Sequence, residues 1–392
     1  MSQHAAMSRY ASVVTAPRLD LDALLAEPAT KIVVCCGSGG VGKTTTAAAL
    51  GVRAAEQHGR RTVVLTIDPA RRLAQSMGLT ELDNTPRQVK GIDTDATGGE
   101  LHAMMLDMKR TFDEVVQQHT TPQRAQEIFA NPFYQAMSST FSGTQEYMAM
   151  EKLAQLRARN EWDLIVVDTP PSRSALDFLD APARLSRFLD GRMLRMLLAP
   201  ARSGGRSMFS LVTASFGLFS RAVQKILGAQ LLTDLSGFVA ALDSMFGGFR
   251  QRADETYRIL QDPQTAFLLV AAPERDAVRE AAYFAERLVA ERMPLAGLVV
   301  NRVHRSALTA LSAEQSEAAA VALDAAGDQQ VTADALRIHA GLLRQTEREV
   351  RVAATFTEAF PGVPTVEVSA QPADVHDVDG LRTIGAALTA AG

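Results

Sequence analysis

Cysteine is almost absent from this chain of 392 residues, and the only two cysteines, Cys35 and Cys36, are adjacent. Two neighbouring thiols cannot build a disulfide framework, and they are too few for a zinc or iron–sulfur site made of cysteines within one chain. The composition therefore excludes a disulfide-stapled protein and fits a reducing compartment.

An excess of one charge and long apolar runs are also missing. Lys and Arg number 40 against 44 Asp and Glu, a net charge of −4, so no positive excess over the whole chain favours nucleic acid or acidic lipid. No segment reaches the roughly 18 uninterrupted apolar residues of a membrane span. The first residues lack the charged start and apolar run of a targeting peptide, so we expect a cytoplasmic protein.

Hydrophobic residues nevertheless make up 47% of the chain, and many occur in short β-branched runs separated by long helical patterns. The first run, 31–36, precedes a helical pattern over 43–57 and a second run at 62–67, which predicts a strand–helix–strand unit with a right-handed crossover. Further strands are predicted at 101–106, 164–167, 266–271, 295–300 and 365–368. This alternation predicts an α/β fold with a doubly wound, mostly parallel sheet.

Two segments depart from the alternation. Residues 1–30 have one short amphipathic turn at 21–25 and otherwise no periodicity, so we expect a mobile or loosely docked N-terminal extension. Between about 183 and 257 no strand pattern occurs, and apolar residues from 231 to 245 recur at alternating steps of four and three. This spacing predicts an amphipathic helix, and hence an α-helical subdomain inserted into an α/β domain of residues 31–392.

A glycine-rich loop follows the first predicted strand. Residues 37–44 read GSGGVGKT, which fits G-x-x-x-x-G-K-[ST] between a strand and a helix and predicts a P-loop NTPase. Main-chain N–H groups would face phosphate oxygens, Lys43 would bridge the β- and γ-phosphates of ATP, and Thr44 would bind Mg²⁺. A glycine-rich turn that binds nothing is the alternative. The predicted nucleotide contacts are Gly39, Gly40, Val41, Gly42, Lys43, Thr44 and Thr45.

Two carboxylates follow predicted strands at the same edge of the sheet. Asp168 closes the run LIVVD, where it would hold a Mg²⁺-bound water; capping of the next helix is the alternative. Asp68 ends the second strand in TIDPA, where it would orient the water that attacks the γ-phosphate; an Asp-Pro turn is the alternative. Thr44 and Asp168 are therefore the predicted metal-site residues, and Asp68 and Lys43 the predicted catalytic residues.

At these residues the chain resembles the family of arsenite-pump (ArsA) ATPases and tail-anchored-protein targeting ATPases, and most of all the paired ATPases of actinobacteria. The blocks GSGGVGKTTT, TIDPARRL and VVDTPPSRSALDFL carry the resemblance, and weaker similarity extends over residues 31–389. The resemblance implies a dimeric ATPase in which Asp68 is the hydrolytic carboxylate, Asn301 contacts adenine and residues 369–372 form the other side of the base pocket. An Asn that merely ends a strand is the alternative for Asn301.

Several positions depart from the family pattern. Ser38 replaces a lysine that reaches across the family's dimer, which implies weakened hydrolysis, a substitute basic residue, or a related partner chain with its own lysine. Residues 172–174 read SRS where the family has Thr-Gly-His. The cysteines of metalloid binding and of a zinc-clamped dimer are absent, so arsenite transport is disfavoured. One phosphate loop, where the arsenite pump has two, implies a homodimer or a heterodimer with a paralogous ATPase.

The predicted insert is rich in methionine, phenylalanine and arginine. The resemblance implies an apolar groove for a hydrophobic membrane-protein client, and core packing is the alternative. The basic residues would contact anionic lipid or phosphate-rich polymers, or form a solvated face. The apolar residues are Met193, Met196, Phe209, Phe216, Phe238 and Met245, and the basic ones are Arg184, Arg187, Arg192, Arg195, Arg202, Arg206, Arg221 and Lys225.

We therefore expect a Mg²⁺-dependent ATPase that couples its nucleotide state to the handling of a membrane-protein client as a dimer. Two other functions stay open: a positioning ATPase that binds DNA or membrane, and a weakly active subunit that regulates a paralogous ATPase. The family that the chain resembles belongs to a larger class that includes septum-positioning ATPases. Residues 381–392 lack the basic amphipathic anchor of those relatives, which disfavours the membrane version.

Overall fold

The computed structural model describes residues 16–68, 72–132, 134–135, 144–170, 255–308, 310–327 and 329–390. The chain divides into two compact units. The larger unit comprises residues 1–105, 159–175 and 260–392, and its described part contains the β-sheet. The described part of the smaller unit consists mainly of helices.

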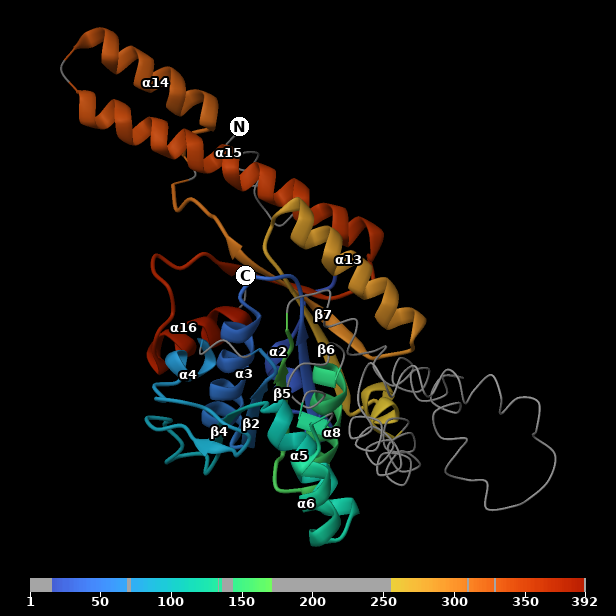
Figure 1. Ribbon diagram of the computed structural model, residues 1–392. Helices are drawn as coiled ribbons and strands as arrows, with labels where there is room; N and C mark the ends of the chain where they lie inside the picture. Colours follow the sequence, from blue (N-terminus) through green and yellow to red (C-terminus); the bar gives the residue numbers. More distant parts are fainter. Residues whose placement is uncertain are drawn as a thin grey trace, which may run out of the picture. The chain divides into compact units, whose positions relative to one another are not determined.

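Within the described residues, the sheet of the larger unit has the strand order β3-β4-β2-β5-β1-β6-β7-β8 (Figure 1). Neighbouring strands pair in parallel, except that β3 and β4 are antiparallel. The predicted α/β fold with a doubly wound, mostly parallel sheet is confirmed. The strands are β1 (Ile32–Cys36), β2 (Arg61–Thr66), β3 (Arg87–Gln88), β4 (Glu100–Met105), β5 (Leu164–Asp168), β6 (Thr265–Ala271), β7 (Leu295–Val303) and β8 (Thr365–Ser369).

The strands at the centre of the sheet are buried along their whole length. All residues of β1, β5 and β6 are buried, as expected for parallel strands covered on both faces, and this burial explains their continuous apolar runs. β1 lies between β5 and β6, and the chain continues outward from it to both sides. The carboxyl end of β1 is therefore the switch point at which open α/β sheets bind ligands.

Helices of the larger unit cover both faces of the sheet (Figure 1). α3 (Lys43–His58) connects β1 to β2, and α13 (Arg275–Ala290) connects β6 to β7 on the other side of β1. Right-handed crossovers in opposite directions place these two helices on opposite faces. α16 (Val378–Thr389) packs beside α3. Two shorter helices are α2 (Leu21–Ala26) and α4 (Arg72–Ser76).

A long helical hairpin of α14 (Ala313–Ala326) and α15 (Gln330–Ala359) extends away from the sheet (Figure 1). The Ser316 hydroxyl and Nδ1 of His339 lie 2.9 Å apart in a buried contact between the two helices. A small apolar core holds the same helices together at Ala313, Ala340 and Leu343. The hairpin is therefore stabilised mainly by contacts between its own two helices.

Residues 16–30 are firmly packed, which corrects the expectation that residues 1–30 are mobile or loosely docked. Leu21 and Leu25 of α2 are completely buried. The sequence showed the amphipathic turn but gave no sign of the surface that covers it, because that surface is formed by α3 and α16 from opposite ends of the chain. Residues 1–15 lie outside the described part of the chain.

Main-chain hydrogen bonds tie this N-terminal segment to β8. The N–H of Leu19 donates to the carbonyl of Thr365 at 3.0 Å, and the N–H of Thr365 donates to the carbonyl of Pro17 at 2.8 Å. The buried Arg60 guanidinium donates to the carbonyl of Thr30 at 2.6 Å, and also to that of Leu25 at 3.0 Å. The segment is thus fixed to the sheet edge at one end and to the start of β2 at the other.

The smaller unit contains α5 (Met108–His119), α6 (Pro122–Ala130) and most of α8 (Thr144–Arg159). Tyr134 is fully buried, and its hydroxyl donates to the Asp113 carboxylate at 2.6 Å. Lys152 of α8 forms a 3.0 Å ion pair with Glu114 of α5. The predicted insert at about 183–257 lies outside the described residues apart from 255–257. A search of the described helices finds none long and apolar enough to cross a membrane.

Candidate functional site

The glycine-rich loop connects β1 to α3 at the switch point of the sheet. Gly42 has φ 96°, a left-handed conformation, and a Cβ atom there would stand 2.2 Å from Nδ2 of Asn301. A Cβ atom on Gly37 would stand 2.0 Å from the carbonyl oxygen of Val270 at the end of β6. Glycine is therefore required at both positions because the loop passes directly against β6 and β7.

The loop opens onto the N-terminus of α3. No side chain caps this helix at Gly42, so the first turn presents its main-chain N–H groups and its partial positive charge to the cavity beside it. Lys43 is only 7% exposed, and its ammonium group donates to the carbonyl of Ser38 at 2.8 Å. Burial lowers the pKa of Lys43, whereas the nearby Asp168 carboxylate opposes that shift.

Asp168, at the end of β5, is completely buried beside two hydroxyl groups. Thr44 donates to its Oδ2 at 2.8 Å and Thr66 donates to the same oxygen at 2.9 Å. Burial raises the pKa of Asp168 to about 6, although the two hydroxyl hydrogen bonds act in the opposite direction. The other oxygen, Oδ1, has no hydrogen-bond partner among the described residues.

This oxygen cluster fits a hard divalent cation. Mg²⁺ binds through one or two oxygen ligands of the protein and retains several waters, so the Thr44 hydroxyl with a carboxylate behind it is a suitable donor set. An unpartnered carboxylate oxygen in a buried place also favours a nearby cation or its waters. Among the described residues, no group of three or more His, Cys, Asp and Glu side chains could hold a metal ion.

The two cysteines lie on β1 and are buried. Burial raises the pKa of Cys36 to about 12 and raises that of Cys35 as well. Both are therefore neutral thiols at physiological pH, so they pack as small apolar side chains and are poor nucleophiles.

Asp68 lies two residues beyond the end of β2 and lines the same cavity as the loop. Its main-chain N–H donates to the hydroxyl of Thr66 at 3.2 Å, so Thr66 contacts both the Asp68 backbone and the Asp168 carboxylate. The adjacent residues 69–71 of the predicted Asp-Pro motif lie outside the described residues.

Asn301 lies within β7, which continues to Val303, so the alternative that this residue ends its strand is wrong. The side chain is 8% exposed, and its Nδ2 donates to the carbonyl of Val41 in the loop at 2.8 Å. This bond connects the end of β7 to the loop after β1. An amide has two N–H donors and an oxygen acceptor, so the bond to Val41 leaves further groups for a ligand.

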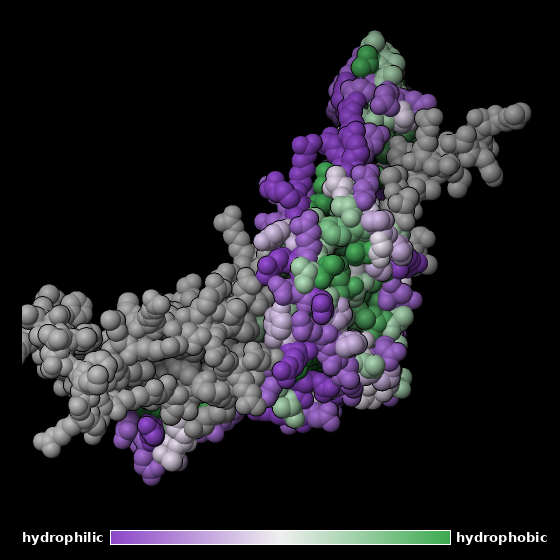
Figure 2. All heavy atoms as spheres, turned by 90° about the vertical axis from the view of Figure 1, so that its right-hand side faces the viewer, coloured by the Kyte–Doolittle hydropathy of each residue, from purple (hydrophilic) through white to green (hydrophobic). Residues whose placement is uncertain are grey.

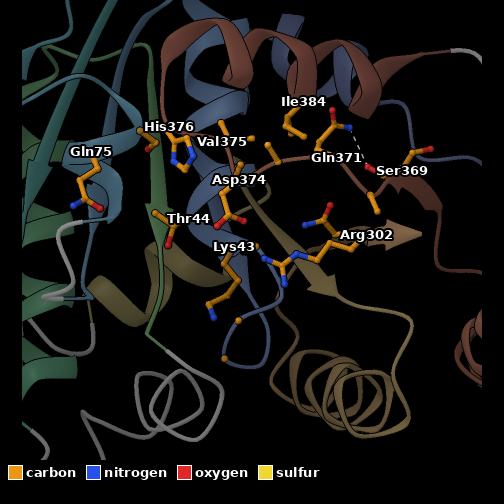
Figure 3. Close-up of a pocket in the computed structure, with 18 of the residues that line it drawn as sticks. Lys43, Thr44, Gln75, Arg302, Ser369, Gln371, Asp374, Val375, His376 and Ile384 are labelled. Carbon is orange, nitrogen blue, oxygen red and sulfur yellow. Dashed lines mark hydrogen bonds between the residues drawn. The ribbon is translucent and has the colours of Figure 1, made fainter. Parts of the chain in front are cut away.

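A cavity of about 800 Å³ lies between the loop and the carboxyl ends of β7 and β8 (Figure 3). It brings together most of the predicted site residues, while Val41 and Asp168 lie behind the cavity wall in contact with lining residues. Three residues of the predicted base side, 369–371, also line it. The predicted residues that line the cavity are Gly39, Gly40, Gly42, Lys43, Thr44, Thr45, Asp68 and Asn301.

Sequence reasoning missed several polar residues that line the cavity. Arg302 and His304 follow Asn301, and Asp374 and His376 belong to the segment between β8 and α16. Arg302 could have been predicted from the sequence, because it directly follows the predicted site residue Asn301. Asp374 and His376 lie in a loop without periodicity, so only the folded chain shows that they reach the cavity.

The mostly parallel sheet, the loop after β1 and the carboxylate at the end of β5 define a P-loop nucleotide hydrolase. The model of the anion-transporting ATPase family (ArsA ATPase) matches residues 30–318, and the chain belongs to this family of ATP hydrolases. The resemblance to this family that the sequence predicted is thereby confirmed. The match begins after α2 and ends inside α14, so most of the helical hairpin lies beyond it.

The chain is similar to several named relatives. ATPase GET3 of Malassezia globosa is 26% identical over 275 residues, which cover 69% of this chain and 71% of that protein. ATPase get3 of Schizosaccharomyces pombe is 26% identical over 288 residues, covering 72% and 76%. A protein named as an arsenical pump-driving ATPase in Prosthecochloris vibrioformis is 30% identical over 160 residues, or 40% of this chain and 36% of its own length.

Proposed function

We propose that this ATPase binds MgATP at the loop of residues 37–44 and hydrolyses it as a dimer in the cytoplasm. One observation carries the site. The Thr44 hydroxyl of the loop motif donates to the buried Asp168, whose second oxygen has no partner among the described residues. This pair would hold Mg²⁺, which neutralises charge on the phosphate oxygens when bound.

The loop and Lys43 would bind the phosphates. In the structure the Lys43 ammonium group is held by the Ser38 carbonyl, within the motif itself. A phosphate oxygen is a stronger partner for an ammonium group than a neutral carbonyl, because both partners of the new bond are charged. Binding would therefore transfer Lys43 from Ser38 to the nucleotide, while the N–H groups of the first turn of α3 hold the β-phosphate.

Asp68 would position the attacking water. Its carboxylate would accept a hydrogen bond from the water and take its proton as the new oxygen–phosphorus bond forms and the bond to the leaving oxygen of ADP breaks. The base would lie toward Asn301 and residues 369–371, which line the same cavity as the loop.

Dimer formation and client handling are the finer parts of the proposal. A single phosphate loop and the family resemblance support a pair of chains, either identical or paralogous. The Met- and Phe-rich segment supports a hydrophobic membrane-protein client, which would be bound or released according to the nucleotide state.

Two substitutions test the nucleotide site. Lys43→Ala is expected to weaken MgATP binding by about 100-fold because charged hydrogen bonds to phosphate are lost, as measured by calorimetry. Lys90→Ala, which removes an exposed lysine outside the cavity, is the matched control and should bind like the parent chain. Equal binding by both variants would contradict the proposed site.

Asp68→Asn is expected to bind MgATP with unchanged affinity and to hydrolyse it about 10²- to 10⁴-fold more slowly, since the proton acceptor is lost. Phosphate release under saturating MgATP measures the rate. Turnover close to that of the parent chain would remove Asp68 from the catalytic role and leave the binding site intact.

The client is tested with a membrane protein that has a single C-terminal apolar helix. It should co-purify with the ATPase at high salt and raise ATP turnover, because apolar contacts are insensitive to ionic screening. Absence of both effects over a set of such helices would exclude this client class. Salt-sensitive capture of DNA instead would favour the positioning ATPase.

A further inference from the structure

Arg302 is held in an unusual backbone conformation at the end of β7. Its φ is 62°, in the left-handed region that few residues other than glycine adopt. The pairing of β7 with β8 shifts register between Asn301 and Val303, so Arg302 is the extra residue of a β-bulge. Bulges redirect side chains, and strained residues of this kind concentrate at functional sites.

The bulge directs the Arg302 side chain into the nucleotide cavity. Arg302 lines the cavity together with Lys43 and Thr44, and Figure 3 shows its side chain extending from the strand end into that space. The residue is exposed, and its guanidinium has no hydrogen bond or ion pair among the described residues. By contrast, the nearby Arg305 forms an ion pair with Glu367.

The position of Arg302 relative to the phosphate loop is also fixed. The preceding residue, Asn301, is buried and donates to the Val41 carbonyl of the loop, and Gly42 packs directly against the Asn301 amide. The following residue, Val303, accepts a main-chain hydrogen bond from Ala370 at 2.9 Å. The backbone on both sides of Arg302 is thus fixed beside a loop suited to phosphate, and a guanidinium binds phosphate through charged, often bidentate hydrogen bonds.

We propose that Arg302 is a further nucleotide-binding residue whose guanidinium contacts the phosphate chain of the bound nucleotide from the β7 side of the cavity. This inference rests on the proposed ATP site. It assigns a second basic residue of the same chain, in addition to Lys43, to the phosphates, and gives the strained bulge a function.

The test compares MgATP and MgADP binding by calorimetry in the full chain and its variants. Arg302→Met keeps much of the side-chain shape without the charge and is expected to weaken both ligands by about 10- to 100-fold. Arg302→Lys keeps the charge and should recover part of that loss. The parent chain should also lose affinity more steeply with salt than Arg302→Met, since a charged contact is screened.

Arg292 provides a matched control, because it is an exposed arginine with φ 56° that does not line the cavity. Arg292→Met should bind both nucleotides like the parent chain. Arg302→Gly should melt at or above the temperature of Arg302→Ala, since glycine tolerates positive φ, while both bind nucleotide weakly. Weak binding in stably folded variants then cannot be attributed to misfolding.

The outcomes separate this inference from the proposed function. If the parent chain binds neither nucleotide, the proposed ATP site fails. If the parent chain binds and Arg302→Met binds equally well, the site stands and the role of Arg302 is overturned. Full affinity in Arg302→Met together with weak binding in Arg302→Lys would indicate steric exclusion and would also overturn it.

Discussion

At the scale of single residues, the site contains a buried carboxylate, Asp168, whose ionised form is poorly stabilised by the rest of the folded chain. Asp168 is completely buried, and its two hydroxyl partners both donate to Oδ2. Burial raises its pKa to about 6, so ionisation of this group opposes folding in the absence of a ligand. Cation-binding sites are commonly less stable when empty, and binding of the ligand to the folded state then restores the lost stability.

The first prediction concerns this buried carboxylate. Because the folded pKa is above the unfolded one, its contribution to stability falls as pH rises from about 4 to about 6. In the presence of a chelator, Asp168→Asn should therefore be more stable than the parent chain at pH 7.5, by on the order of 2 kcal/mol, and the difference should shrink at pH 5. Thermal or urea unfolding at both pH values measures it.

Asp168→Asn should also hydrolyse ATP more slowly than the parent chain. In the proposed site Asp168 would orient the waters of Mg²⁺, so its loss is expected to reduce Mg²⁺-dependent ATP turnover by about 10- to 100-fold. A stability difference that is equal at both pH values would show that the buried charge is not its cause.

A second prediction concerns the crowded glycine of the loop. In Gly42→Ala the new Cβ would meet the Asn301 amide at 2.2 Å, whereas a Cβ at Gly91, which also has positive φ, meets nothing within 4 Å. Both variants are destabilised by the strain of a left-handed backbone at alanine. Only Gly42→Ala adds a steric overlap with Asn301, which lowers the free energy of unfolding by about 1–3 kcal/mol in packed sites. Gly42→Ala should also lose nucleotide binding. Equal melting temperatures in the two variants would contradict this account.

At the scale of elements, α2 is attached to α3 by a network of charges. The Arg53 guanidinium donates to Asp22 at 2.7 and 2.6 Å, and Nε2 of His58 lies 2.9 Å from the same carboxylate. The hydrogen bond from Arg53 lowers the pKa of Asp22 to about 2. This network holds the start of the described chain against the helix that begins at the phosphate loop.

The third prediction follows from that network. A lowered folded pKa contributes stability that is present above pH 4 and lost as pH falls toward 2. Asp22→Asn should therefore lower the melting temperature at pH 6–8, by an amount equivalent to about 1 kcal/mol or less because the pair is partly solvated. The difference from the parent chain should decrease between pH 4 and pH 3. A constant difference would assign the effect to packing.

Elements with strong local patterns were predictable from sequence, and those that depend on distant contacts were not. The apolar run 164–167 and the glycine-rich loop define β5 and the start of α3 because burial on both faces and phosphate binding need those residue types. β3 is only Arg87–Gln88, too short for any pattern. The packing of residues 16–30 and the bulge at Arg302 depend on β8, which is far away in the sequence.

At the scale of the whole molecule, the site is assembled from segments spread over most of the chain. The loop comes from the first strand, Asp168 from the fifth, and the opposite wall of the cavity from β7, β8 and the segment before α16. Closure of this cavity around a nucleotide would therefore connect both halves of the sheet. The long α15 helix reaches the same place, since His304, which lines the cavity, lies 2.7 Å from Glu349.

The fourth prediction concerns this assembly. MgATP at 100 times its dissociation constant should raise the free energy of unfolding by about 2.7 kcal/mol, because it binds only the folded chain. Lys43→Ala at the same concentration should show an increase of only about 0.4 kcal/mol, because its affinity for MgATP is about 100-fold lower. If two copies of the chain associate, light scattering with MgATP should give a molar mass of twice the 42.2 kDa of one chain. A monomer mass under every nucleotide condition would exclude the homodimer.

The N-terminal segment has a consequence for how this chain can be shortened. Among the described residues β8 is the last strand of the sheet, and Pro17 and Leu19 form main-chain hydrogen bonds with Thr365 at the start of its free side. A protein trimmed to the start of the family match at residue 30 would leave these groups of Thr365 unpaired and would expose the apolar surface that packs against Leu21 and Leu25. Unpaired main-chain groups on an edge strand can form hydrogen bonds with a strand of another molecule. The trimmed protein is therefore expected to aggregate through edge-to-edge strand pairing. Residues 16–30 thus protect this edge of the sheet from pairing with another chain.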